Sequence, residues 1–255
     1  MRIVSLQSGS NGNCVYVEAR GVRLLFDAGI SGKQAEQRLA ACGADIRRVD
    51  ALLISHDHAD HVRCAGIYQR KFGLPICVTR ETLRAAAAAY DLGEIADVRS
   101  FRRGTTLRFD GVSVETVPTA HDGTDGAAFV VDDGRRRLGI LTDLGHVFAG
   151  LDEMVRSLDA VLIESNYDPD MLEAGPYPAF LKRRIRGPGG HISNLESAEL
   201  LLAADGRRMK WAALAHLSEQ NNDPDLALRT HRRIGGRRFP LHVASRCRAT
   251  RLPEL

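Results

Sequence analysis

Three histidines and two aspartates lie within seven residues at positions 55–61, directly after the apolar run at 51–54. Such a run is typical of a buried strand, so the polar cluster begins where that strand ends. Neutral imidazole and carboxylate groups are ligands that zinc and similar divalent ions prefer. We interpret the pattern H-x-H-x-D-H as ligands for two ions. His56 and His58 converge on one ion, while Asp60 and His61 turn toward the second. A polar turn of solvated histidines would explain one of these side chains but not the whole pattern.

The bulk composition is that of an ordinary globular protein. Hydrophobic residues make up 44% and charged residues 26% of the 255-residue chain. The N-terminus has no signal-peptide pattern, and no apolar stretch approaches the roughly 20 residues that a membrane-spanning helix needs. Five scattered cysteines without a C-x-x-C pair indicate a reducing compartment. We therefore predict a cytoplasmic protein that does not enter a membrane.

Short strands and helices alternate along the chain. Strands are expected at 3–6, 14–18, 22–26, 51–54, 76–78, 105–109, 112–117, 127–132, 137–141, 160–164, 211–215 and 239–243. Helices are expected at 32–42, 61–72, 80–91, 151–157, 177–186, 193–204 and 224–233. This order predicts an α/β fold in which two sheets lie face to face with helices outside. We expect one domain of four layers spanning residues 1–255.

Further candidate ligands follow other predicted strands. His121, Asp143 and His216 each stand just past an apolar run, where a loop carries them to one edge of the sheets. A single histidine at a strand end is more often a surface residue, so the prediction rests on the three together. Asp27 ends another strand, either as a turn cap or as a carboxylate that orients a ligand histidine.

A possible anion site lies around His191. Ser193 and Glu196 have the spacing of a capping box, so a helix begins there and His191 stands just ahead of it. The free N–H groups and the dipole of a helix N-terminus attract anions. The alternative is an ordinary loop histidine.

Two other stretches are candidates for binding a phosphate-containing substrate. The Gly/Ser/Asn loop at 8–14 contains Ser10, Asn11 and Asn13, and its backbone N–H groups would either cradle a phosphate or only form a tight turn. A Gly-Pro-Tyr-Pro loop precedes a basic helix, and there the candidate residues are Tyr177, Lys182, Arg183 and Arg184. The net charge of +3 decides nothing by itself, and for any single arginine cluster a solvated surface is the simpler explanation.

The ordered residues Asp27, H-x-H-x-D-H, His121, Asp143 and His216 resemble the five motifs of the metallo-β-lactamase superfamily. The resemblance implies a four-layer αββα sandwich with a dinuclear site at one edge of the sheets. It implies that one metal is bound by His56, His58 and His121 and the other by Asp60, His61 and His216, with Asp143 bridging the two.

Several motifs also resemble the YycJ/WalJ family, in the nuclease-like part of that superfamily. They include S-G-S-x-G-N-C, L-F-D-A-G, L-T-D-L-G, E-S-N-Y-D, G-H-I-S-N and H-L-S-E-x-N-N. The resemblance implies DNA exonuclease activity. Similarity to tRNA 3′-processing phosphodiesterases implies that His191, paired with Glu164, contacts the scissile phosphate. The short spacings from His121 to Asp143 and from Asp143 to His191 leave no room for a tRNA-binding arm or an inserted β-CASP domain.

The predicted activity is therefore hydrolysis of a phosphodiester, such as a nucleic acid, by a hydroxide that bridges two divalent metal ions. Asp60 would bind metal and take the water proton, and His191 with Glu164 would stabilise the phosphorane charge or protonate the leaving oxygen. We predict Ser193 among the substrate contacts. Zinc suits this nitrogen-rich donor set, with manganese or iron as alternatives. A glyoxalase II-like thioesterase or lactonase is the rival hydrolase, and a non-catalytic regulator is the rival from another class.

Overall fold

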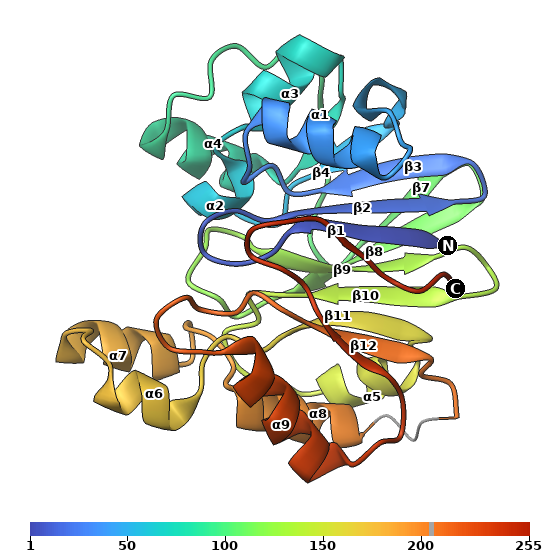
Figure 1. Cartoon of the computed structure of the whole chain (residues 1–255). Helices are drawn as coiled ribbons and strands as arrows, with labels where there is room; N and C mark the ends of the chain where they lie inside the picture. Colours follow the sequence, from blue (N-terminus) through green and yellow to red (C-terminus); the bar gives the residue numbers. More distant parts are fainter. Residues whose placement is uncertain (204–206) are drawn as a thin grey trace.

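The computed structural model describes residues 1–203 and 207–255. Within those residues the strands form two seven-stranded sheets that lie face to face, with helices on both outer surfaces (Figure 1). The predicted αββα sandwich is therefore confirmed. None of the helices in the described part of the chain has the length and apolar content needed to cross a membrane.

The first sheet has the strand order β14-β1-β2-β3-β4-β5-β6. Its strands are β1 (Arg2–Gln7), β2 (Cys14–Ala19), β3 (Val22–Phe26), β4 (Ala51–Leu53), β5 (Ile76–Val78), β6 (Val98–Ser100) and β14 (Thr250–Arg251). Strands β3 to β6 run parallel to one another, whereas the pairs β14–β1, β1–β2 and β2–β3 are antiparallel.

The second sheet has the order β13-β12-β11-β10-β9-β8-β7. Its strands are β7 (Thr106–Phe109), β8 (Val112–Pro118), β9 (Ala127–Asp132), β10 (Arg137–Leu141), β11 (Ala160–Glu164), β12 (Trp211–Ala215) and β13 (Leu241–Val243). Strands β10 to β13 are parallel, and β8 and β10 share a direction because each is antiparallel to β9. The carboxyl ends of β8, β10, β11 and β12 therefore meet at one edge of this sheet.

Helices cover each sheet on its outer side (Figure 1). The first sheet is covered by α1 (Gly32–Ala41), α2 (Ala59–Val62), α3 (Ala65–Phe72) and α4 (Arg80–Ala89), with a short 3₁₀ turn η1 (Ile46–Arg48). The second is covered by α5 (Leu151–Arg156), α8 (Asn194–Leu202) and α9 (Pro224–Gly235). Helices α6 (Pro169–Ala174) and α7 (Ala179–Arg186) lie beyond the edge opposite the chain termini, on the side of the β1–β2 loop.

Three apolar clusters hold the layers together. The central cluster joins side chains from the facing surfaces of both sheets, among them Phe26, Phe129 and Trp211. A second cluster packs α1, α3 and α4 on the first sheet, and a third packs α5, α8 and α9 on the second. Strands such as β4 and β11 are buried along their whole length, which explains why they read as continuous apolar runs rather than alternating ones.

One helix was wrongly predicted to be continuous. The expected helix over 61–72 is two helices, α2 and α3, separated at Arg63 and Cys64. The backbone N–H of Cys64 donates to the carbonyl of Ala28 at 3.0 Å, so it leaves the helical hydrogen-bond ladder. The predicted helix over 193–204 corresponds to α8, and its expected end at Ala204 lies outside the described residues.

Candidate metal centre

The candidate donor residues follow strands whose carboxyl ends lie at one edge of the sandwich. Strand β4 leads into the histidine cluster, and β8, β10 and β12 lead into His121, Asp143 and His216 respectively. Three of the six non-glycine residues with a positive φ in the described chain are Asp27, Asp143 and His216. Asp and His tolerate this left-handed backbone better than most residues, and such strained positions concentrate at functional sites.

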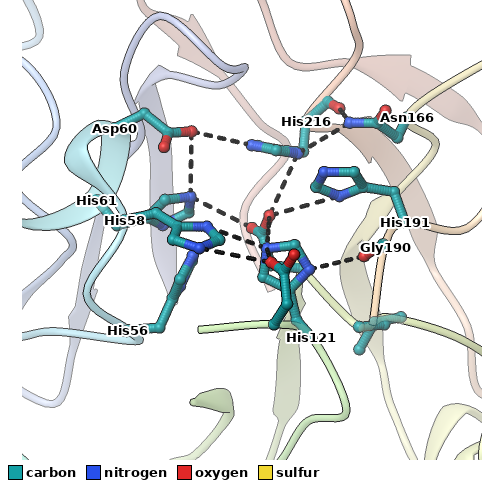
Figure 2. A network of polar contacts seen from close by, with 12 residues as sticks. His56, His58, Asp60, His61, His121, Asn166, Gly190, His191 and His216 are labelled. Atoms are coloured by element: carbon teal, nitrogen blue, oxygen red, sulfur yellow. Dashed lines mark hydrogen bonds and ion pairs between the residues drawn. The ribbon is translucent and has the colours of Figure 1, made fainter. Parts of the chain in front are cut away.

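His56, His58 and His121 form one group of donors, with ring nitrogens within 4.8 Å of one another. The Nε2 atom of His121 lies 3.2 Å from Nδ1 of His58 (Figure 2). On its other side, Nδ1 of His121 donates to the carbonyl of Gly190 at 2.6 Å, which leaves Nε2 free to bind a metal. The structure thus brings together the three residues predicted for the first ion.

Asp60, His61 and His216 form a second group within the same 4.8 Å limit. The Oδ2 atom of Asp60 lies 3.4 Å from Nε2 of His61 and 3.3 Å from Nε2 of His216. Asp143 lies between the two groups, because its Oδ2 is 3.3 Å from His61 Nε2 and its Oδ1 is 3.7 Å from His121 Nε2. Its position is that expected of a ligand shared by two ions.

Two buried atoms show that this donor set fits divalent cations. His56 Nε2 and Asp143 Oδ2 are both shielded from solvent and without a hydrogen-bond partner in the described protein. A buried polar atom of this kind is costly unless something binds it. Burial and the neighbouring histidines also hold the pKa of His56 well below its usual range, so its imidazole is neutral and able to bind metal.

Polar side chains behind the donors fix the orientation of the rings. Asp27 Oδ2 lies 2.8 Å from His61 Nδ1, and Asp27 Oδ1 accepts the backbone N–H of Ser55 at 2.8 Å. The hydroxyl of Ser55 contacts the rings of both His56 and His61. Of the two interpretations of Asp27, the geometry favours the carboxylate that orients a ligand histidine.

Two further orienting residues were missed in the sequence. Asn166 Nδ2 lies 3.1 Å from Nδ1 of His216 and donates to its carbonyl, and Asp122 Oδ1 lies 3.5 Å from Nε2 of His58. Asn166 follows a recognisable signal, since it comes just after β11. Asp57, by contrast, accepts the backbone N–H of Thr124 at 2.6 Å and the hydroxyl of Thr124 at 3.3 Å.

His191 and Glu164 form a pair at the rim of this centre. Nδ1 of His191 lies 2.6 Å from Oε1 of Glu164 and 3.7 Å from Oδ1 of Asp143. Glu164 is fully buried and its Oε2 accepts the N–H of Leu144. Burial alone would raise the pKa of Glu164, but His191 outweighs it and holds the pKa far below its usual range. An ionised Glu164 keeps the proton of His191 on Nδ1.

The loop at 8–14 lies beside Asp60. Asn13 is 5% exposed, and its Nδ2 donates to Asp60 Oδ2 at 3.1 Å, so its side chain turns toward the donors rather than toward solvent. The N–H groups of Gly9, Gly12 and Asn13 already bond within the protein. Ser10 and Asn11 remain at the exposed tip of the loop.

The other predicted substrate residues lie around α7 and α8. Ser193 caps α8 with Glu196 as predicted, but it is only 3% exposed. Tyr177 is half-buried against the apolar cluster under α6 and α7. Lys182 donates to the carbonyl of Glu173, and Arg183 and Arg184 are exposed. Arg184 makes a bidentate contact with Asp122, at 2.6 and 3.0 Å, which joins α7 to the His121 loop.

Comparisons with known proteins agree with this fold and donor cluster. Residues 8–205 match the metallo-β-lactamase superfamily. The metallo-β-lactamase fold protein YhfI from Bacillus subtilis superposes with a TM-score of 0.75 over 98% of this chain and 99% of that one, at 15% identity. The class that the fold and the donor cluster define is thus the metallo-β-lactamase type.

Two relatives narrow the class. Exodeoxyribonuclease WalJ of Streptococcus pneumoniae strain D39 is 35% identical over 226 residues, covering 87% of this chain and 83% of the relative. Exodeoxyribonuclease YycJ of Bacillus anthracis is 33% identical over 224 residues, covering 87% and 84%. The chain belongs to the YycJ/WalJ family of the metallo-β-lactamase superfamily.

Proposed function

We propose that this protein is a metal-dependent nuclease that hydrolyses phosphodiester bonds at the ends of DNA. The observation that carries the proposal is the buried Glu164 carboxylate, 2.6 Å from His191 at the rim of the donor cluster. A small-molecule thioesterase or lactonase has little need for such a pair, whereas a phosphodiesterase needs a proton donor for its leaving oxygen. The names of the two relatives support the choice of DNA as substrate.

The residues divide the reaction between them. Two divalent cations held by the donors would activate a water and neutralise charge on the phosphate. The Asp60 carboxylate lies between two donor rings, with its Oδ2 3.4 Å from Nε2 of His61 and 3.3 Å from Nε2 of His216. Asp60 accepts a proton from the attacking water as its oxygen bonds to phosphorus. As the phosphorus–oxygen bond to the leaving group breaks, the imidazolium form of His191, with a proton on each ring nitrogen, donates its Nε2 proton to that oxygen and retains the Nδ1 proton toward Glu164.

We further propose zinc as the native ion, because histidine nitrogens dominate the donor set. Manganese and iron are the alternatives, and metal analysis of natively purified protein separates the three. All five cysteines are free thiols and four are buried, which supports the cytoplasm as the compartment. The central core, with side chains from both sheets, supports one hydrolase domain spanning residues 1–255.

The test is an assay of metal-quantified protein on end-labelled single- and double-stranded DNA and RNA, with bis-p-nitrophenyl phosphate as a minimal phosphodiester. Asp60→Ala and His191→Ala variants should each lose about 100- to 10 000-fold in DNA turnover, because each removes a proton-transfer group. Asp57→Asn is the matched control, since this neighbouring carboxylate contacts Thr124 and not the donors. It should retain most of the activity.

Two outcomes would contradict the proposal. In the first, wild-type protein loaded with Zn²⁺ or Mn²⁺ cleaves neither nucleic acid nor bis-p-nitrophenyl phosphate. In the second, it hydrolyses S-lactoylglutathione or lactones in preference to DNA, as the rival hydrolase would.

A further inference from the structure

Helix α7 presents an aromatic ring to solvent beyond the metal centre. Phe180 is 66% exposed, more than Ile67 at 43% and Val147 at 42%, the other large apolar residues that stand out from the described surface. Its opposite face, with Leu181 and Ile185, packs on the apolar cluster below α6 and α7. The exposed ring is therefore not needed to hold the helix in place.

Basic side chains share the face of Phe180. Arg183 and Arg184 follow it by three and four residues, which places all three on one side of the helix. Arg183 is exposed and contacts no acidic or polar partner among residues 1–203 and 207–255. Lys182 and Arg186 differ, because both bind Glu173. The exposed face thus combines one aromatic ring with one uncommitted guanidinium.

The carboxyl end of α7 is fixed to the metal centre. Arg184 binds Asp122, whose Oδ1 lies 3.5 Å from His58. The backbone N–H of His191 donates to the carbonyl of Ile185 at 2.9 Å, so the proposed proton donor is attached to the last turn of this helix. The helix that carries Phe180 is therefore joined to the donors at its carboxyl end.

We propose that the exposed face of α7 binds the unpaired end of a DNA strand, with Phe180 stacking on a base and Arg183 contacting a phosphate. The inference rests on the proposed function and names the part of the molecule that holds an unpaired strand end. Stacking on aromatic side chains beside positive charge is how proteins hold single strands without reading sequence. In a duplex both faces of an internal base are already stacked, so a protruding ring selects frayed or single-stranded ends.

The spacing along the helix suits this assignment. Phe180 precedes Arg184 by four residues, a rise of about 6 Å, roughly one nucleotide of an extended strand. Arg184 in turn binds Asp122, which lies beside His58, so the helix leads from Phe180 toward the donors. Arg183, the uncommitted guanidinium, lies between Phe180 and Arg184 along the helix.

The binding test uses full-length metal-loaded protein carrying Asp60→Asn to prevent cleavage, and a fluorescein-labelled single-stranded oligonucleotide followed by anisotropy. Phe180→Ala should weaken binding by about 5- to 100-fold, the range that loss of one stacked base produces. Phe180→Trp should bind as tightly as the parent, because it keeps the aromatic face. Ile67→Ala is the matched control, an exposed apolar side chain on α3, and it should leave the affinity unchanged.

A substrate-side variation makes the test specific to stacking. A set of oligonucleotides is prepared, each with one abasic site at a different position from the end. For the parent protein, the abasic site should lower the affinity at one position only. For Phe180→Ala, the affinity should not depend on the position of the abasic site. Equal affinity of Phe180→Ala and parent would overturn the inference. A loss of affinity at the abasic position that is the same for the parent and for Phe180→Ala would also overturn it. A third contrary result would be sedimentation data showing that Phe180→Ala dissociates an oligomer and that this dissociation accounts for the whole loss of affinity.

A turnover assay in the Asp60-containing protein separates this inference from the proposed function. Phe180→Ala should lower DNA turnover at low substrate but leave bis-p-nitrophenyl phosphate turnover unchanged. If the wild-type protein hydrolyses neither substrate, the proposed function fails. If it hydrolyses both and Phe180→Ala matches it on DNA, only the role of α7 fails.

Discussion

At the scale of single residues, each donor ring of the metal centre is held by a polar partner behind it. Ser55 and Asp27 orient His61, Asn166 orients His216, and Asp122 lies against His58. Such partners fix the ring orientation and tautomer, and their loss typically costs about 10- to 100-fold in metal affinity or activity. The strength of the centre therefore depends on residues that touch no metal.

A different buried histidine should set the acid sensitivity of the fold. His231 lies between α8 and α9, 2.9 Å from the carbonyl of Ala227 and 3.2 Å from the hydroxyl of Ser197. Burial lowers its pKa from 6.5 to about 4. Between these values the unfolded chain binds a proton that the folded protein does not, so stability falls as pH falls from 6.5 to 4. The expected loss is on the order of 3 kcal/mol.

Urea unfolding of metal-free protein at several pH values in this window measures the effect. Subtracting the same series for His231→Gln removes contributions shared with other groups. The free energy of unfolding should change more steeply with pH in the wild-type protein than in the variant throughout the window. Parallel curves of unfolding free energy against pH would show that protonation of His231 does not destabilise the folded state.

Sequence patterns predicted the donors better than the residues around them. His56, His58, His121, Asp143 and His216 were predicted because histidines and aspartates at strand ends stand out against apolar runs, and the structure brings them together. Asp122 was missed because an aspartate beside a histidine is common in loops. Phe180 was missed because exposure of one apolar residue depends on how α7 packs, which short periodicity does not reveal.

At the scale of elements, the connection from α7 to α8 carries His191, the proposed proton donor, and also holds His121, a candidate metal ligand. Gly190 accepts the Nδ1–H of His121, and the next residue is His191. A Cβ on Gly190 would lie 2.1 Å from the carbonyl oxygen of Ile185, whereas the nearest atom to a Cβ on Gly189 would be 3.3 Å away. Close backbone packing therefore requires glycine at position 190 but not at position 189.

Gly190→Ala should therefore displace the connection and weaken both functions that it supports. We expect at least about a tenfold loss in metal affinity, because His121 loses the carbonyl that orients its ring. DNA turnover should fall further, because His191 moves as well. Zinc competition with a chromophoric chelator measures the first and the end-labelled DNA assay the second.

Gly189→Ala is the matched control and should retain most of both. Circular dichroism establishes that each variant is folded. Equal effects of the two substitutions would show that the connection is adaptable, contrary to the packing.

The elements themselves were largely predictable, and the exceptions have physical causes. Strands β3, β9 and β10 begin and end where the apolar runs do. The short strands β6 and β14 were not predicted, because they are partly exposed edges without a clear pattern. The break between α2 and α3 depends on a hydrogen bond from Cys64 to distant Ala28, which no local pattern encodes.

At the scale of the whole molecule, the donor cluster lies where the edges of the two sheets meet. His56 to His61 follow β4 of the first sheet, whereas His121, Asp143 and His216 follow strands of the second. Ions bound by both sets would tie the sheets together at the edge opposite the chain termini (Figure 1). The metals would therefore support the fold as well as the reaction.

Metal removal should accordingly lower the stability of the entire domain. Binding to the folded state alone stabilises it by about 4 kcal/mol when free metal exceeds Kd a thousandfold, so Zn²⁺ should raise Tm by about 10 °C over protein in EDTA. His216→Ala should lose most of this shift, because one group of donors is broken, whereas Asp57→Asn should keep it. Because both sheets contribute ligands, the shift should appear in the main cooperative transition, by calorimetry. A Tm that is the same with Zn²⁺ and with EDTA would mean that the cluster binds no metal in the folded protein.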